Sequence, residues 1–208
     1  MILLIDTHGS EIGVGLAESG VLVRESHAPL AKDLDDDLIP RIRTLLAEEG
    51  LFFDALEAFA VSVGPGSFTG VRIGLTTAKI FAQVTEKPLY GLSTLEILAA
   101  ASGEERVRAV LDARRGNVFT GFYERDGALY RAVGEEGFAR LDELDGPMIS
   151  TKNALGVPAV GEEELLAAMA KLAEARKNAG KSDHPMLLAA RYLRPSQAER
   201  ERACRSEK

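Results

Sequence analysis

The sequence predicts an α/β protein of two lobes, each of which opens with an antiparallel meander of strands. Two observations predict this class. Apolar strand-like segments alternate with amphipathic helical segments, and the pattern starts again near the middle of the chain. Matched residues mark the repeat: Asp6, Gly9 and Gly20 in the first half, and Asp112, Gly116 and Gly127 in the second.

The first half contains the stronger secondary-structure signals. Apolar runs predict a meander of three strands, then a strand over 58–63 and a short one over 89–91. Helical spacing of apolar residues predicts helices over 36–49 and 69–85. The sequence Ser93-Thr-Leu-Glu96 has the capping-box pattern and predicts the start of a third helix.

The second half begins after a polar break over 102–106. Three further strands are expected over 107–112, 118–124 and 128–133, followed by a helix over 162–178 and a short helix over 185–193. We therefore expect a first lobe over 1–102, a second and smaller lobe over 103–195, and a charged tail over 196–208.

Charge and composition exclude some classes of function. The 208 residues carry a formal net charge of −7, so direct and strong binding to nucleic acid is not expected. No apolar run reaches the length of a membrane-spanning helix. Cys204 is the only cysteine, which excludes an intrachain disulfide and fits the reducing cytoplasm.

A glycine-rich loop between the strand over 58–63 and the next helix is the strongest motif. Such a turn can hold phosphate groups with backbone N–H groups at a helix N-terminus. Its spacing matches neither the P-loop, because no Gly-Lys-Ser/Thr follows, nor the dinucleotide fingerprint, because Thr69 stands where the third glycine belongs. A generic strand–loop–helix turn remains open beside a phosphate site.

The helix over 69–85 has two apolar stripes, and its Gly70, Gly74, Ala78 and Ala82 form a row of small residues. Either both stripes pack within this protein, or one packs on the sheet and the other on a second protein. The three histidines, His8, His27 and His184, are far apart in sequence and form no HxxxH pattern, so no metal site is expected.

Several blocks in order resemble the TsaB (YeaZ) family: Ile2–Thr7, Gly64-Pro-Gly-Ser-Phe-Thr-Gly-Val-Arg-Ile-Gly74, Gly91–Thr94, Asp112–Arg114 and Tyr192–Arg194. The resemblance implies an actin-like ATPase fold (ASKHA superfamily) of two ribonuclease-H-like lobes, the second reduced. Leu34 and Asn117 depart from the family's pattern.

The resemblance also implies a function. It predicts a cytoplasmic, non-catalytic scaffold of the complex that places the threonylcarbamoyl group on the adenosine 3′ to the anticodon of ANN-decoding tRNAs. The expected partners are a TsaD-like transferase, a TsaE-like ATPase and, in isolation, a second copy of the chain. Binding of tRNA is expected only through the complex, and no cofactor is expected beyond weak ATP or ADP binding or nucleotide at a partner interface.

Two sets of site residues follow, and no catalytic residue is expected. The partner-binding set lies on the first two helices: Leu38, Ile42, Leu45, Leu46, Val71, Gly74, Leu75, Ala78 and Ala82. We expect Ile42→Asp or Leu75→Asp to break partner binding without unfolding the chain. A vestigial phosphate loop comprises Asp6, Thr7, Gly64, Gly66, Ser67, Thr69, Gly70 and Asp112.

Two alternative functions remain. An actin-like ATPase would use Asp6, Asp112 and the loop from Gly64 to Gly70, and would show Mg-dependent nucleotide binding. A metallopeptidase would need bound metal, which the scattered histidines disfavour.

Overall fold

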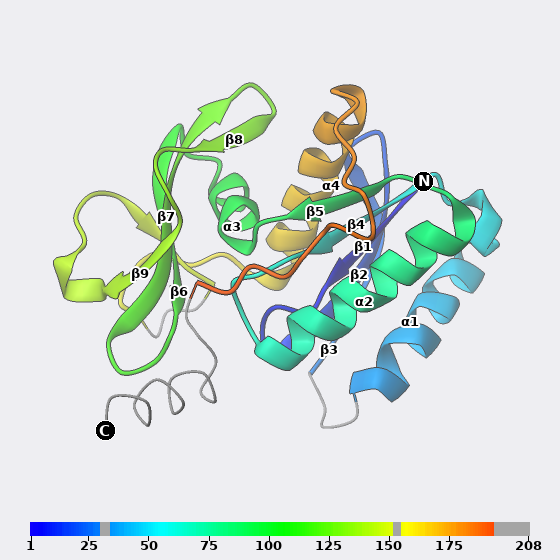
Figure 1. Cartoon of the computed structure of the whole chain (residues 1–208), viewed down its shortest axis with the longest axis horizontal. Coiled ribbons are helices and arrows are strands. Elements are labelled where there is room, and N and C mark those ends of the chain that lie inside the picture. Colours follow the sequence, from blue (N-terminus) through cyan, green and yellow to red (C-terminus); the bar gives the residue numbers. More distant parts are fainter. Residues whose placement is uncertain (30–33, 152–154, 194–208) are drawn as a thin grey trace.

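The computed structural model describes residues 1–29, 34–151 and 155–193, and these residues form two sheets with helices on and between them (Figure 1). The first sheet has the order β3-β2-β1-β4-β5. Its strands are β1 (Ile2–Asp6), β2 (Glu11–Glu18), β3 (Val21–Pro29), β4 (Ala58–Ser62) and β5 (Leu89–Leu92). The first three form the expected antiparallel meander, and β4 and β5 join it in parallel to β1.

The second sheet repeats the meander. It has the order β10-β6-β7-β8, and β9 also pairs with β7. Its strands are β6 (Arg106–Asp112), β7 (Asn117–Asp126), β8 (Leu129–Ala132), β9 (Gly137–Arg140) and β10 (Met148–Ile149). Strands β6, β7 and β8 are antiparallel in turn, as β1, β2 and β3 are. The predicted repeat is therefore a repeat of structure: β10 joins β6 in parallel, as β4 joins β1, but among the described residues the second sheet has no counterpart of β5.

Two helices cover one face of the first sheet, and two lie on its other side. The helices α1 (Leu34–Glu48) and α2 (Phe68–Thr85) share one apolar core with that sheet. The helices α3 (Thr94–Ser102) and α4 (Glu162–Asn178) share the other core with both sheets. Short 3-10 turns lie at Phe53–Ala55 and Leu141–Glu143. Figure 1 shows α3 between the sheets, with α4 beside the first.

Burial explains why the central strands could be found from sequence. Every residue of β1 and of β4 is buried, so both strands are apolar on both faces and appear as continuous apolar runs. Strand β3 is only partly buried because it lies at the edge of the sheet. No helix within the described residues is long and apolar enough to cross a membrane.

The helix expected over 185–193 is absent, which corrects the sequence prediction. Residues 185–187 form a turn, and the segment then runs extended beside the first sheet toward the second (Figure 1). Asp183 forms an antiparallel bridge with Leu89, and the N–H of Arg191 donates to the carbonyl of Val63 at 2.7 Å. These backbone bonds to the sheet, with Leu188 packed on the first core, replace the bonds of a helix.

Each half of the sequence, divided at the expected boundary near residue 102, supplies a helix that packs on the sheet of the other half. Helix α3 precedes the boundary but packs on β6, β7 and β8, whereas α4 follows it but packs on β1, β2 and β3. The limits of the two lobes therefore stay a prediction, and the tail over 196–208 lies outside the described residues.

Burial within α1 predicts that truncation of two aliphatic side chains of this helix will lower the stability of the protein by very different amounts. Leu45 is 1% exposed and Ile39 is 40% exposed. We expect Leu45→Ala to lower the free energy of unfolding by about 2–5 kcal/mol, because it leaves a cavity. Ile39→Ala should cost less than about 1 kcal/mol. Urea denaturation of both variants measures this, and equal losses would contradict the packing of α1.

Candidate functional site: the glycine-rich loop and the outer faces of α1 and α2

Asp6 stands at the end of β1 in a buried polar cluster. Its Oδ1 accepts a hydrogen bond from the hydroxyl of Ser62 at 2.6 Å and one from the N–H of His8 at 3.2 Å. The same oxygen lies 2.7 Å from Nδ1 of His8, with both side chains at most 5% exposed. The side chains of Ser62 and His8 therefore point toward the carboxylate of Asp6 and bond to it.

Burial and pairing act in opposite directions on the carboxyl group of Asp6. Desolvation by burial raises its pKa, but the charge of His8 and hydrogen bonds from His8 and Ser62 lower it more. The net result is a pKa below the usual range, so Asp6 is ionised within the protein. Glu162, at the start of α4, shows the reverse: burial and then the charge of Asp6 raise its pKa.

The glycine-rich loop is packed against the turn that follows β1. The N–H of Ser67 donates to the carbonyl of His8 at 2.7 Å, and the hydroxyl of Thr7 donates to the carbonyl of Gly70 at 2.7 Å. A Cβ at Gly66 would lie 2.5 Å from the His8 carbonyl oxygen, and one at Gly70 would overlap that of Thr7. The glycines therefore permit a close approach of two backbone segments.

The other three residues of the predicted phosphate loop are Gly64, Thr69 and Asp112. Gly64 has a φ of +96°, and a Cβ there would lie 2.9 Å from the carbonyl oxygen of Arg191. Thr69 is exposed in the first turn of α2. Asp112 ends β6 in the second sheet, is exposed, and accepts a hydrogen bond from the N–H of Arg114 at 2.7 Å. Asn117 holds the same turn, because its amide donates to the carbonyls of Arg114 and Arg115.

The carboxylate of Asp6 is not exposed to the nucleotide-bound metal that an actin-like ATPase fold implies. The Oδ1 of Asp6 is already bonded to Ser62 and His8, and its side chain is 4% exposed. Among the described residues, no three His, Cys, Asp or Glu side chains are grouped so that they could hold a metal ion. The turn at residues 7–8 packs directly on the glycine-rich loop.

The predicted partner-binding residues all lie inside the protein, which corrects their proposed role as surface contacts. The most exposed of them, Leu75, is 6% exposed, and Ile42 is 1% exposed. Gly74 is buried as well, with the side chain of Thr7 where its Cβ would stand. Core packing accounts for their apolar character, and Ile42→Asp or Leu75→Asp would bury an unpaired charge rather than spare the fold. Contact of these helices with a partner stays a prediction.

The faces of α1 and α2 that point away from the sheet carry other apolar side chains. Ile80 is 54% exposed and Val84 is 78% exposed on α2, and Ile39 is 40% exposed on α1. Next to the end of α2, a groove of about 650 Å³ is lined by residues of that helix and of the segment 182–186. Met186 and Leu187 are 65% and 81% exposed beside it. Sequence periodicity showed two stripes on α2 but not which one faces outward.

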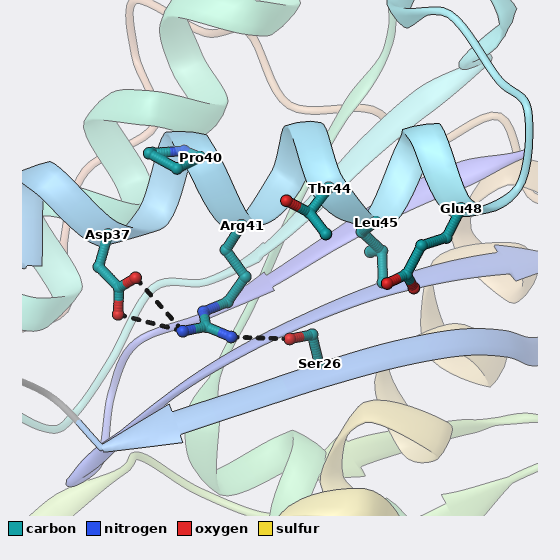
Figure 2. A pocket seen from close by; sticks show the side chains of 7 residues that line it. All are labelled: Ser26, Asp37, Pro40, Arg41, Thr44, Leu45 and Glu48. Carbon is teal, nitrogen blue, oxygen red and sulfur yellow. Dashed lines mark hydrogen bonds and ion pairs between the residues drawn. The ribbon is translucent and has the colours of Figure 1, made fainter.

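A smaller pocket of about 190 Å³ lies between α1 and β3 (Figure 2). The guanidinium of Arg41 donates to Ser26 on β3 at 2.8 Å and to both carboxylate oxygens of Asp37 at 3.2 and 3.3 Å. Its Nε is buried and has no hydrogen-bond partner among the described residues. Thr44 and Glu48 complete the far side of this pocket.

Sequence reasoning missed a second buried polar cluster, centred on Glu136 in the loop between β8 and β9. The hydroxyls of Ser93 and Tyr123 both donate to its Oε1, and Arg191 lies 3.2 Å from its Oε2 as an ion pair. The capping box predicted for α3 is not formed, because Ser93 is bonded to Glu136 and makes no cap. Burial, followed by the charge of Glu136, raises the pKa of Tyr123, which therefore stays a hydrogen-bond donor.

Glu96, the other half of that capping pattern, forms an ion pair with Arg176 of α4 at 2.6 Å. Burial raises its pKa, and the positive charges of Arg176 and Arg191 oppose the rise. No local sequence signal predicts these pairs, because their members lie 13 or more residues apart, and those of the pairs Ser93–Glu136 and Glu96–Arg176 lie 43 and 80 apart.

The chain matches known proteins in both sequence and structure. The model of the TsaD family, tRNA N6-adenosine threonylcarbamoyltransferase, matches residues 29–179. The Bacillus subtilis tRNA threonylcarbamoyladenosine biosynthesis protein TsaB is 34% identical over 69% of this chain. YeaZ from Pseudomonas aeruginosa superposes with a TM-score of 0.77 over 92% of this chain and 99% of its own, at 26% identity. The chain belongs to the TsaB (YeaZ) family.

The match to the curated relatives is partial along their length. This chain covers 64% of the Bacillus subtilis protein, and it covers 55% of the Escherichia coli TsaB, to which it is 36% identical over 130 residues. The meander repeated in the two sheets of this chain and the YeaZ superposition confirm the actin-like fold expected from the sequence.

Gly70→Ala tests whether the loop glycines serve backbone packing. The added methyl group would overlap the carbonyl oxygen of Thr7, so we expect a loss of about 1–3 kcal/mol or more in the free energy of unfolding. Gly137→Ala is the matched control, because its Cβ would meet nothing within 4 Å. Urea denaturation should show near wild-type stability for the control. A Gly70→Ala variant as stable as the control would refute the close approach.

Asp6→Asn tests the buried pair through its pH dependence. The carboxyl pKa is lower in the folded than in the unfolded protein, so Asp6 stabilises the fold above about pH 4 and loses this effect as pH falls through the folded-state pKa. We expect Asp6→Asn to cost on the order of 3 kcal/mol at pH 7 and less near pH 3. Denaturation across pH measures the difference, with exposed Asp112→Asn as a control that should lose little. A cost that does not shrink in acid would contradict the pairing.

Proposed function

We propose that the chain acts in the biosynthesis of threonylcarbamoyladenosine in tRNA, as a non-catalytic subunit that binds a TsaD-like transferase. Membership of the TsaB family, whose curated members carry that pathway in their names, supports the process. The observation that supports the binding role is the apolar stripe left exposed on α2. Burial of Ile80 and Val84 by a partner would remove apolar surface from water, which favours association.

The proposed interface uses the outer faces of α1 and α2. These helices cover the same face of the first sheet and contact each other, so Ile39 and Ile80 belong to one side of the molecule. The groove beside the end of α2 extends this side toward Met186 and Leu187. In isolation the same apolar surface would suit a second copy of the chain.

The arrangement around Asp6 supports a subunit that needs no nucleotide of its own. Its carboxylate is bonded to Ser62 and His8, and the glycine-rich loop is packed by the chain's own backbone at Thr7 and His8. We therefore propose that ATP is handled by a TsaE-like ATPase or at a partner interface. With a net charge of −7, the chain would reach tRNA through the complex, in the cytoplasm.

The experiment that tests this function is a calorimetric titration of the chain with a purified TsaD-like transferase, with ATP hydrolysis by the chain alone measured beside it. Saturable binding without hydrolysis is the expected result. Absence of binding, together with Mg-dependent hydrolysis that Asp6→Asn abolishes, would replace the proposal with the ATPase alternative.

Ile80→Asp should weaken binding of the transferase by at least tenfold, because a carboxylate would replace a desolvated apolar contact. Its exposure of 54% means that the free chain should keep nearly all of its stability. Val133→Asp is the matched control: Val133 is 42% exposed but follows β8 in the second sheet. If both variants bind like the wild type, the α2 interface is wrong.

A further inference from the structure

The two edges of the first sheet differ. The free edge of β5 is covered by the chain itself, through the bridge between Leu89 and Asp183 and a hydrogen bond from the N–H of Gly91 to the Asp183 carboxylate. The opposite edge is β3, nine residues long, and within the described part of the chain nothing pairs with its outer side. An unpaired edge presents a row of N–H and C=O groups to which another strand can bind.

Both sides of this open edge are flanked by pockets. On the α1 side, the pocket of about 190 Å³ shown in Figure 2 is bounded by Ser26 of β3 and by Arg41 and Thr44 of α1. On the α4 side, a groove of about 610 Å³ runs between residues 20–25, which are the start of β3 and the glycine before it, and α4, where Ala167 and Lys171 line it.

The register of the sheet places the two pockets on opposite faces. Ser26 pairs with Val14, which belongs to the core beneath α1 and α2. Leu22 pairs with Ala17, which belongs to the core beneath α4. Side chains of a strand added outside β3 would point alternately to these two faces, and hence toward one pocket and then the other.

We propose that β3 is a docking edge, which binds an extended, basic segment of another protein as a sixth strand. Backbone hydrogen bonds to β3 supply the attachment, and the two pockets read alternate side chains, a mode of recognition known for sheet edges in general. Basic residues face the α1 pocket, and short aliphatic residues face the groove beside Leu22 and Ala167. This surface is separate from the outer face of α2.

Charge favours a basic segment. Four carboxylates, those of Asp37, Glu48, Glu25 and Glu163, line the two pockets, against three cationic side chains, those of Arg41, Arg24 and Lys171. Arg41 is paired with Asp37 and Arg24 with Glu48, which neutralises part of this charge. The surplus of negative charge lies in the α1 pocket, where two carboxylates stand against Arg41. The net charge of −7 adds a field that attracts a basic segment.

The same features disfavour a second copy of the chain on this edge. Two copies would each bring a charge of −7, and the middle of β3 presents Arg24 and Glu25 with a register shift in its pairing at Leu16/Ala17. Charged residues and bulges are the means by which edge strands avoid unselective pairing.

The test uses a fluorescein-labelled peptide of nine residues, with lysine at the odd positions except for a central threonine, and valine at the even positions. We expect saturable binding to the whole chain by fluorescence anisotropy. Hydrogen exchange should then show protection of β3 amides. A peptide with glutamate for lysine, and one with proline at two central positions, should each bind at least tenfold more weakly.

Variants that fill the pockets locate the binding. Thr44→Trp and Ala167→Phe should each weaken peptide binding at least tenfold, whereas Ala47→Trp on α1 and Asn178→Phe on α4 should not, because these exposed controls line neither pocket. Circular dichroism and a wild-type unfolding curve confirm that each variant is folded.

Several results would overturn the proposal. Failure of the lysine peptide to bind, equal binding of the proline peptide, or binding without protection of β3 amides would each exclude strand addition. Equal binding of the glutamate peptide would exclude the charge preference, and concentration-dependent dimerisation that Val23→Lys abolishes would assign the edge to a second copy. Binding of the transferase is measured separately on Ile80→Asp, so the two proposals fail independently.

Discussion

The close approach between the turn after β1 and the first turn of α2 is the constraint on which the first lobe depends. A hydrogen bond from Ser67 to the His8 carbonyl and one from Thr7 to the Gly70 carbonyl fix the start of α2 against the end of β1. Glycine at positions 66, 70 and 74 leaves room for that backbone. Once α2 is set at this angle and depth, its outer side chains are determined, and they form the surface proposed for the transferase.

Polar pairs, rather than apolar contacts alone, join the two sheets. Glu136 is carried by the second sheet but accepts hydrogen bonds from Ser93, at the start of α3, and from Tyr123 of β7. Arg191 reaches the same carboxylate from the segment that follows α4. Because Glu136, Ser93 and Tyr123 are buried, loss of one would leave a buried polar group without its partner, and this makes the relative position of the sheets specific.

The sequence predicted elements whose signal is local, and it failed where the structure depends on distant contacts. Strands β1 and β4 and helix α4 are correct because continuous or periodic apolar residues are enough to specify them. Strand β9 was missed because pairing with β7 decides its conformation. The segment 185–193 was given a helix, whereas the bond from Arg191 to the carbonyl of Val63 holds it beside the sheet. The glycine-rich loop was found as a motif, but its partners at Thr7 and His8 lie more than fifty residues away. Periodicity likewise could not tell which stripe of α2, that of Leu75 or that of Ile80, faces inward.

The exchange of α3 and α4 between the halves sets an order of events during synthesis of the chain. All five strands of the first sheet have been synthesised once Leu92 has been added, yet the face that α4 covers stays bare until Asn178 has followed. In that interval apolar residues such as Leu4 and Ala60 lack their final cover. The nascent first sheet is therefore the stage at which this chain most needs protection from aggregation, and its fold is completed from the C-terminal side.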